Sequence, residues 1–344
     1  MICPGGMMSA AVTQVMDRCG AAWPEAHLDA GKMADLGIAM REAAGFDNIA
    51  LPFCMTVEAE SFGADVDIGS RTVQPRVRGF ALDADADFKL PAPQWHGGRA
   101  VVLLDALARS RHRESEAVIV GNVVGPFSLL GMLVDPLKIM RWTRRSPERL
   151  SGCLTVLAGH LGEFARRQVA AGADIICIAE PTATGEILGG DKFAEFVAPR
   201  INEIAAAVRS ACARVIVHIC GDVSRIGNEL KTIDTDALSV DAMVDIIALA
   251  RSDMHALMMG NLSAFMLASA STHDIARRCR ALLAGGVRLI APACGIIPDT
   301  PVANLRAMSE ALRDAPVAGS GDRLYNGEAR GPCSESKGSD DERH

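Results

Sequence analysis

The chain has 344 residues, of which 49% are hydrophobic, 22% are charged and 4% are aromatic, and its formal net charge is −7. A chain of this length can bury a large core, either as one α/β barrel or as two smaller domains. The sequence has no Lys- and Arg-rich run and few aromatic side chains, so it lacks the basic surface and stacking platforms that nucleic-acid binding needs, and we expect no nucleic-acid partner.

Short apolar segments alternate with longer amphipathic segments along almost the whole chain. The apolar segments are candidate strands, at residues 1–4, 48–53, 118–124, 174–179, 215–220, 237–240, 255–259 and 287–291. The amphipathic segments are candidate helices, at 26–44, 98–112, 147–171, 192–211, 223–231, 241–250, 272–284 and 301–312. Eight strand–helix units predict a single-domain (β/α)8 TIM barrel of the α/β class, and a doubly wound open sheet is the alternative.

Two regions depart from this alternation. Residues 63–95 follow the second candidate strand and contain turn residues and several Asp, which indicates an inserted hairpin and polar loop. Residues 314–344 are rich in Gly, Ser, Asp and Arg and poor in apolar residues, which is typical of a disordered tail. We therefore expect one barrel domain at 1–313, followed by a disordered tail at 314–344.

Two stretches, 117–134 and 254–272, lack Asp, Glu, Lys and Arg over nearly the length of a membrane span. Glycine and asparagine interrupt both stretches, which favours buried strands running into loops, so we expect no membrane segment. The ten cysteines are scattered, and the start of the sequence lacks the pattern of a secretion signal. These features favour a reducing, cytoplasmic location with free thiols.

Residues 215–223 read V-I-V-H-I-C-G-D-V, a candidate strand with a histidine and a cysteine set two positions apart. Side chains two apart on a strand share a face, so His218 and Cys220 point the same way near its carboxyl end. In a barrel the carboxyl ends of all strands open onto one mouth, where reacting groups collect. Cys294 follows the eighth candidate strand and is expected to reach the same mouth.

One imidazole and two thiolates are good ligands for zinc, which prefers a tetrahedral site, and three protein ligands leave one position open. His218, Cys220 and Cys294 are therefore candidate ligands of a catalytic Zn2+. The alternative is that both cysteines are small buried hydrophobic side chains and the histidine belongs to a core hydrogen-bond network.

Several stretches also form a pattern found in a known family. They are C-P-G-G-M-M at 3–8, P-F-C-M-T-V-E-A-E at 52–60, G-P-F-S-L-L-G at 125–131, E-P-T-A-T-G-E-I-L at 180–188, H-I-C-G-D at 218–222, A-L-S-V-D at 237–241, M-G-N at 259–261 and A-P-A-C-G-I-I-P-D-T-P-V-A-N at 291–304. In these stretches the chain resembles the uroporphyrinogen decarboxylase superfamily, and within it the branch of methylcobamide:coenzyme M methyltransferases. The resemblance covers roughly residues 2–312.

The resemblance implies a (β/α)8 barrel in which His218, Cys220 and Cys294 hold a catalytic zinc ion. It also implies transfer of a methyl group from a protein-bound methylcobamide, which is a corrinoid, to a thiol such as coenzyme M that zinc activates as a thiolate. The usual corrinoid-binding signature, a histidine in D-x-H-x-x-G, is absent from the sequence. We therefore expect the corrinoid to arrive on a partner protein.

Two carboxylates are second-tier candidates for catalysis. Glu180 follows the fourth candidate strand, and could be a weak fourth zinc ligand or a partner of His218, although similar proteins usually carry aspartate there. The alternative is a solvated loop carboxylate. Asp241 closes the sixth candidate strand and could orient a ligand or substrate, or could simply cap the next helix.

Methionines near the mouth could face the corrinoid, because this side chain adapts to irregular apolar surfaces. The candidates are Met7, Met8 and Met55, with core filling as the alternative for each. Glu58 and Glu60 follow the second candidate strand, and we expect both to be exposed.

Two other functions stay open. The parent enzyme of the superfamily is a metal-free decarboxylase whose porphyrinogen substrate carries many carboxylates and requires arginines at the mouth. This chain has C-P-G-G-M-M where the decarboxylases carry an arginine-rich motif, and its one tyrosine, Tyr325, lies in the expected tail. The second is a non-catalytic barrel that binds zinc or a corrinoid. The residues do not identify the thiol acceptor, the original methyl donor or the oligomeric state.

Overall fold

The computed structural model describes residues 11–83 and 89–313. They belong to one compact unit, Met1–Asp314. The expected first strand at 1–4, the candidate residues Met7 and Met8, and the expected tail at 314–344 lie outside the described residues.

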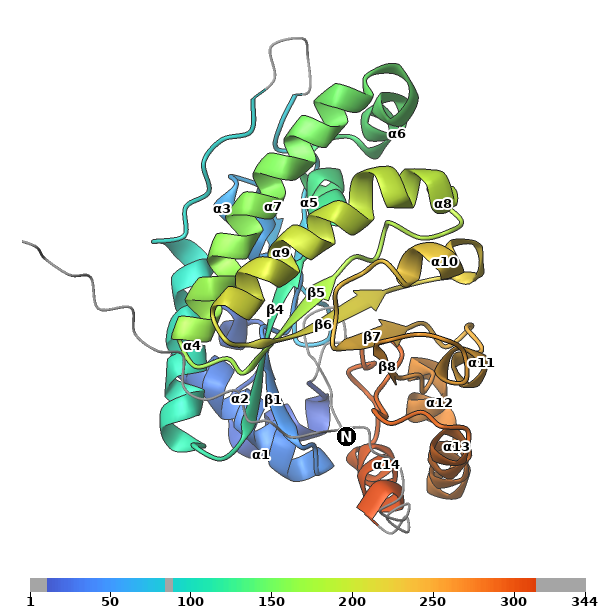
Figure 1. Ribbon diagram of the computed structural model, residues 1–344. Helices are drawn as coiled ribbons and strands as arrows, with labels where there is room; N and C mark the ends of the chain where they lie inside the picture. Colours follow the sequence, from blue (N-terminus) through green and yellow to red (C-terminus); the bar gives the residue numbers. More distant parts are fainter. Residues whose placement is uncertain (1–10, 84–88, 314–344) are drawn as a thin grey trace, which may run out of the picture. The chain divides into compact units, whose positions relative to one another are not determined.

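Parallel strands form one six-stranded sheet in the order in which they occur along the chain (Figure 1). They are β1 (Asn48–Leu51), β4 (Val118–Val124), β5 (Ile175–Ala179), β6 (Arg214–Ile219), β7 (Ala237–Val240) and β8 (Leu257–Met259). The predicted bounds of 118–124 and 237–240 are confirmed, and the ends of the other four agree to within two residues. The register places His218 of β6 between Ala179 of β5 and Ser239 of β7.

The eighth expected strand, 287–291, is less regular than predicted. This segment runs parallel to β8 but joins it through one isolated bridge, Met259 to Leu289, and a second bridge, Leu262 to Pro292, follows just beyond both. The backbone hydrogen bonds here are separate ones: Leu289 O accepts from the Gly260 N–H, and Leu262 bonds on either side of Pro292, to Ala291 O and the Ala293 N–H. The segment nevertheless occupies the place beside β8 that the alternation predicts.

A small apolar core lies on the inner face of the strands. Each of the six strands and the segment 287–291 contributes one buried side chain, namely Ala50, Val120, Cys177, Ile216, Ala237, Met259 and Ala291. Such a layer of side chains is the packed interior of a TIM barrel. The predicted (β/α)8 architecture is therefore confirmed. His218 is two residues beyond Ile216, so its side chain shares this inner face.

A larger core lies between the strands and the surrounding helices. The helices on this side are α1 (Thr13–Cys19), α2 (Ala30–Ala44), α4 (Gly98–Arg113), α7 (Pro147–Ala170), α9 (Ala198–Ser210), α13 (Thr272–Ala284) and α14 (Val302–Arg313). The long helices α7 and α9 lie side by side over the strands (Figure 1). The Thr272–Ala284 helix has the predicted bounds, and the 192–211 helix begins with a π turn at Phe193–Val197.

Short helices follow the carboxyl ends of the strands and so surround the mouth. They are α3 (Val57–Ser61), α5 (Pro126–Leu133), α6 (Pro136–Arg145), α8 (Gly189–Lys192), α10 (Gly227–Leu230), α11 (Ile246–Ala250) and α12 (Ala264–Ser269). The sequence reading missed α5 and α6, because it extended the apolar run after β4 as a loop. Proline begins both helices, and the Asp135 side chain accepts a hydrogen bond from the Leu137 N–H at 2.8 Å to cap α6.

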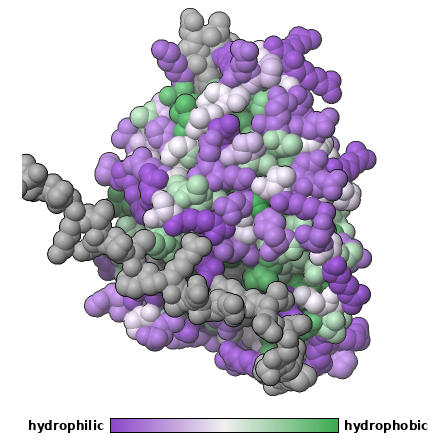
Figure 2. All heavy atoms as spheres, in the orientation of Figure 1, coloured by the Kyte–Doolittle hydropathy of each residue, from purple (hydrophilic) through white to green (hydrophobic). Residues whose placement is uncertain are grey.

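The insertion after β1 is confirmed as a hairpin, since β2 (Val66–Asp67) and β3 (Arg76–Val77) pair antiparallel. Among residues 11–83 and 89–313, no helix is both long and apolar enough to cross a membrane. On the face shown in Figure 2, hydrophilic side chains cover most of the surface and hydrophobic ones form small patches.

Candidate metal centre

His218 lies at the inner, carboxyl-terminal part of β6 and is completely buried. Its Nδ1 is 3.0 Å from Oγ of Ser239, the residue in register with it on β7. Its Nε2 is buried without a hydrogen-bond partner. Burial lowers the pKa of His218 to about 4, and the nearby charge of Asp241 offsets only part of this effect. The imidazole is thus neutral at neutral pH, and a proton on Nδ1 that is donated to Ser239 leaves the Nε2 lone pair free for a ligand.

Two cysteines meet beyond the ends of the strands. Cys220 follows β6 directly, Cys294 follows the segment 287–291, and their Sγ atoms lie 3.8 Å apart. This is far beyond a disulfide bond, and both thiols are free and half-buried. Two thiolates on one tetrahedral zinc ion, each about 2.3 Å from it, would also stand about 3.8 Å apart. The spacing of the pair therefore suits a shared zinc ion.

The two thiols also differ in acidity. A hydrogen bond from Cys220 lowers the pKa of Cys294 to about 7; the backbone N–H of Gly295 adds to this effect, while burial opposes it. The same hydrogen bond raises the pKa of Cys220. The contact between the thiols thus favours loss of a proton from one of them, and a bound cation would displace the remaining proton.

Asp241 lies directly after β7, beside His218 and Cys220. Its Oδ2 accepts a hydrogen bond from the Gly221 N–H at 3.4 Å, and its Oδ1 accepts one from the Met243 N–H at 3.1 Å. The side chain is half-buried, and its negative charge raises the pKa of His218. Asp241 thus ties the loop that carries Cys220 to the end of β7, and it favours positive charge at the site.

Glu180 follows β5 and is completely buried, so it is not the solvated loop carboxylate that was one alternative. Its Oε2 accepts from the Phe127 N–H at 3.1 Å, and its Oε1 accepts from the Ser128 N–H at 2.7 Å and from the Ser128 hydroxyl. Burial raises the pKa of Glu180 to about 7. Both carboxylate oxygens are thus used at the first turn of α5, an arrangement that favours a role in positioning over a role as zinc ligand.

Gly125 makes this contact possible. A Cβ atom at position 125 would lie 2.2 Å from Oε2 of Glu180, which is far inside van der Waals contact. The glycine therefore lets the carboxylate reach the start of α5.

Of the methionines expected to face the corrinoid, only Met55 lies within the described residues. It is half-buried and packs against the core. Its position after β1 is at the mouth, but its packing favours core filling as much as a contact with a ligand.

The expectation that Glu58 is exposed is wrong. Its side chain is 2% exposed, and its Oε1 accepts from the Val124 N–H at 3.0 Å. Glu60, whose side chain is 28% exposed, forms an ion pair with the buried Arg99, which also donates to Cys54 Sγ at 3.3 Å. These carboxylates hold the segment after β1 against its neighbours in the barrel.

Sequence reasoning also missed Ser239 and Ser128 as partners of site residues. A signal for Ser239 was present, because it is two residues before Asp241 on the strand next to His218. For Ser128 there was no such signal, because α5 itself was not predicted.

The residues present fit a zinc ion in their donor chemistry, namely a paired set of sulfurs and an unpartnered neutral imidazole nitrogen. Across the described ranges, no three or more His, Cys, Asp or Glu side chains already form a complete cluster that could hold a metal ion. The sulfur pair is in place, and the contribution of His218 as third ligand stays a prediction.

Comparison with known proteins assigns the family. The model of the family described as uroporphyrinogen decarboxylase (URO-D) matches residues 1–315. The chain belongs to the uroporphyrinogen decarboxylase family. This confirms the resemblance seen in its motifs.

Within the URO-D family, the chain is similar to methyltransferases over most of its length. It is 31% identical over 302 residues to the methylcobamide:CoM methyltransferase MtaA of Methanosarcina barkeri. The aligned residues cover 86% of this chain and 88% of that protein. The solved structure of a methyltransferase from Methanosarcina mazei superposes with a TM-score of 0.84 at 30% identity, and the match covers 90% of this chain and 93% of that one. A uroporphyrinogen decarboxylase from Chloroflexus aggregans is 28% identical over 228 residues, 62% of this chain and 63% of its own length.

Proposed function

We propose that this protein is a zinc-dependent methyltransferase that moves a methyl group from a protein-bound methylcobamide to a thiol acceptor such as coenzyme M. The observation that carries the proposal is the 3.8 Å separation of the Cys220 and Cys294 sulfurs, at the same end of the barrel as the buried, neutral His218. The similarity to methylcobamide:CoM methyltransferases over 86% of the chain supports the reaction class.

His218, Cys220 and Cys294 would hold the zinc ion. Zinc would act as a Lewis acid that lowers the pKa of a bound substrate thiol, so that the thiolate is present at neutral pH. The chain's own residues prepare this site: Ser239 holds the Nδ1 side of the imidazole so that Nε2 is left for the metal, and the two cysteines would lose their protons to the solvent. Asp241 holds the loop that carries Cys220 in place.

In the proposed reaction, the substrate thiol loses its proton and a sulfur–carbon bond forms. The cobalt–carbon bond breaks, and its electron pair stays on the cobalt. The protein therefore needs no general base in line with the methyl group. It needs a fixed thiolate and a mouth that admits the corrinoid, which the partner protein would supply. Because the reaction depends on free thiols, we propose a reducing, cytoplasmic setting.

The metal-free decarboxylase is the less favoured alternative. Its relatives match less of this chain, and a porphyrinogen with many carboxylates needs cationic partners in the barrel. Buried Arg99 stands near the mouth, but its donors are used by Glu60, Cys54 and Thr56. A non-catalytic barrel that binds zinc is the other alternative. It would bind the ion through the same three side chains but would bind no substrate thiol.

One experiment separates the three functions. The zinc-loaded protein is mixed with methylcobalamin and a panel of thiols that includes coenzyme M, and the visible spectrum of the corrinoid is followed over time. Thiol-dependent demethylation supports the proposal. A zinc-replete protein that demethylates nothing would favour the binding barrel, and activity on a porphyrinogen without zinc would favour the decarboxylase.

A further inference from the structure

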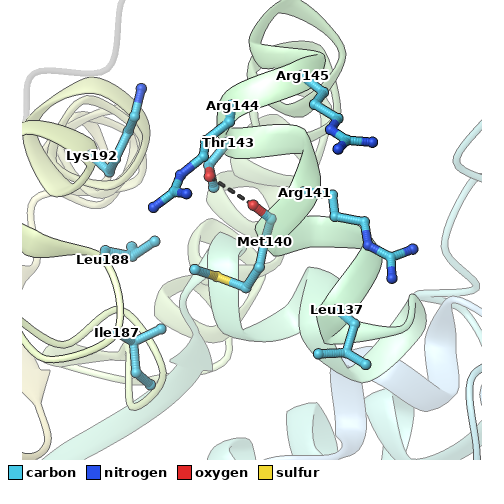
Figure 3. Close-up of a pocket in the computed structure, with 9 residues that line it drawn as sticks. All are labelled: Leu137, Met140, Arg141, Thr143, Arg144, Arg145, Ile187, Leu188 and Lys192. Carbon is cyan, nitrogen blue, oxygen red and sulfur yellow. Dashed lines mark hydrogen bonds between the residues drawn. The ribbon is translucent and has the colours of Figure 1, made fainter.

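Helix α6 presents an unusual exposed face at the mouth of the barrel. It buries Ile139, Trp142 and Thr143 against the body of the protein. Its outer residues include Arg141, Arg144 and Arg145, which are exposed, and Leu137, whose side chain is 67% exposed. Figure 3 shows Leu137, Arg141 and Arg145 along one side of α6, at the spacing of successive helical turns. The exposed face of α6 thus places an apolar side chain beside three arginines.

A cavity of about 490 Å3 lies between α6 and the segment that contains α8. Its lining residues are Leu137, Met140, Arg141, Thr143, Arg144, Arg145, Ile187, Leu188 and Lys192. Met140 and Arg144 point from α6 toward the side of Leu188 and Lys192 (Figure 3). The lining holds four cations and no carboxylate, in a chain whose net charge is −7. We call Arg141, Arg144, Arg145 and Lys192 the basic rim.

The three arginines of the basic rim are available to a partner. Within the part of the chain that the structure describes, none of them has an ion pair, whereas Lys138 on the same helix pairs with Asp83 at 2.8 Å and Lys192 pairs with Glu195 at 2.6 Å. Arginine is enriched at protein interfaces and among the residues that contribute most of their binding energy.

The basic rim is continuous with the end of the barrel that carries the candidate metal centre. A second, apolar cavity of about 210 Å3 shares Met140 and Ile187 with the first and extends to Ser128 and Thr182. The hydroxyls of Ser128 and Thr182 lie 2.8 Å apart, and Ser128 also hydrogen-bonds Glu180 at the end of β5. The strand beside β5 is β6, which carries His218.

Other exposed apolar side chains follow strand ends at the same mouth. Met243, after β7, is 64% exposed, and Phe265, after β8, is 77% exposed. Ile187, after β5, is 47% exposed. The carboxyl-terminal face of the barrel thus combines apolar contacts with a cationic side.

We propose that the basic rim, with Leu137 and Ile187, is the docking surface for the protein that carries the methylcobamide, and that this partner presents an acidic surface beside its cofactor. The proposal rests on the proposed function, which requires a carrier protein to bring its cofactor to this mouth. A free phosphate would use the arginines but not the exposed apolar side chains. The surface combines apolar side chains with positive charge, whereas the chain as a whole is negatively charged. This combination favours an acidic protein as the partner.

The test compares two methyl donors and two charge-reversed variants. The variant Arg141→Glu/Arg144→Glu/Arg145→Glu changes the rim, and the matched control Arg18→Glu/Arg166→Glu/Arg280→Glu changes three exposed arginines away from it. The donors are free methylcobalamin and corrinoid proteins of Methanosarcina barkeri loaded with methylcobalamin. Electrostatic docking predicts that the rim variant loses about tenfold or more in kcat/KM with the protein donor, and that this loss shrinks as salt is raised. With free methylcobalamin the rim variant should stay within about twofold of wild type.

The outcomes are distinct. An equal loss with both donors, together with inhibition of wild type but not of the rim variant by inorganic phosphate, would show a small-anion site instead and would overturn the proposal. Equal losses in the rim and control variants, or no turnover of any protein donor while free methylcobalamin is turned over, would also overturn it. If wild type turns over neither donor with any thiol, the proposed function itself fails.

Discussion

The Sγ atoms of Cys220 and Cys294 lie 3.8 Å apart, although 74 positions separate the two residues in the chain. The barrel brings them together, because β6 and the segment 287–291 end at the same mouth. The pair forms no disulfide, and it lies beyond the strand that carries the neutral imidazole of His218. Such a set of soft donors is better suited to a thiophilic cation than to packing in a core.

Replacing Cys220 by alanine should remove zinc binding and thiol-dependent turnover while leaving a folded barrel, because the residue follows the strand and does not belong to the core. We expect at most about one zinc per hundred chains and a loss of activity of about a hundredfold or more. Zinc content by elemental analysis, activity and circular dichroism check this. The control is Cys153→Ala, another half-buried free cysteine. Wild-type zinc content in Cys220→Ala would remove this residue from the ligand set.

Ser239→Ala should weaken zinc binding without removing a ligand. The hydroxyl lies 3.0 Å from Nδ1 of His218 and orients the ring, and loss of such a partner typically weakens metal affinity by about 10- to 100-fold. Competition with a chromogenic chelator measures the affinity, and Ser239→Thr, which keeps a hydroxyl, should retain most of it. If alanine and threonine bind zinc as tightly as wild type, the hydrogen bond does not support the metal centre.

Glu58 should make stability depend on pH. Burial raises its pKa in the folded protein from 4.5 to about 7, so the folded state holds the proton more tightly than the unfolded state. The contribution of protonated Glu58 to the free energy of unfolding is fully present below pH 4.5 and is lost as the pH rises through 7. Between pH 4.5 and 7.5 the wild type should lose up to about 3 kcal/mol more unfolding free energy than Glu58→Gln, which keeps an oxygen to accept the Val124 N–H.

Urea unfolding at several pH values measures this difference. Glu116→Gln, a change at an exposed carboxylate, is the control and should run parallel to wild type. Parallel curves for wild type and Glu58→Gln would mean that Glu58 is ionised in the folded protein at acid pH.

Gly125→Ala should destabilise the protein by about 1–3 kcal/mol, because the added Cβ would lie 2.2 Å from Oε2 of Glu180 and displace the carboxylate from the start of α5. Gly131→Ala on the same helix is the matched control. An added Cβ meets nothing within 4 Å there, so this change should be neutral or stabilising. Denaturant midpoints compare the two variants, and equal midpoints would contradict the tight contact at Gly125.

The sequence predicts the fold well where one rule dominates. Buried β-branched runs predict β4 and β6, and the 3.6-residue period predicts the helix at Thr272–Ala284. It fails where tertiary contacts decide. Helices α5 and α6 follow an apolar strand without a polar break, and the segment 287–291 pairs with β8 only through an isolated bridge. The burial of Glu58 depends on the N–H of Val124, which is 66 positions away. For the metal centre, the H-x-C spacing predicts a shared face, and the place of Cys294 after the eighth candidate strand predicts that it reaches the same mouth. The contact of Ser239 with His218 was not predicted.

The most direct test of the account is X-ray absorption at the zinc edge on the purified protein, before and after addition of a thiol substrate. The account predicts stoichiometric zinc with two sulfur neighbours at about 2.3 Å and nitrogen or oxygen neighbours at about 2.0–2.2 Å, and a third sulfur when the thiol is added. Protein that takes up no zinc, or zinc surrounded only by nitrogen and oxygen, would contradict it.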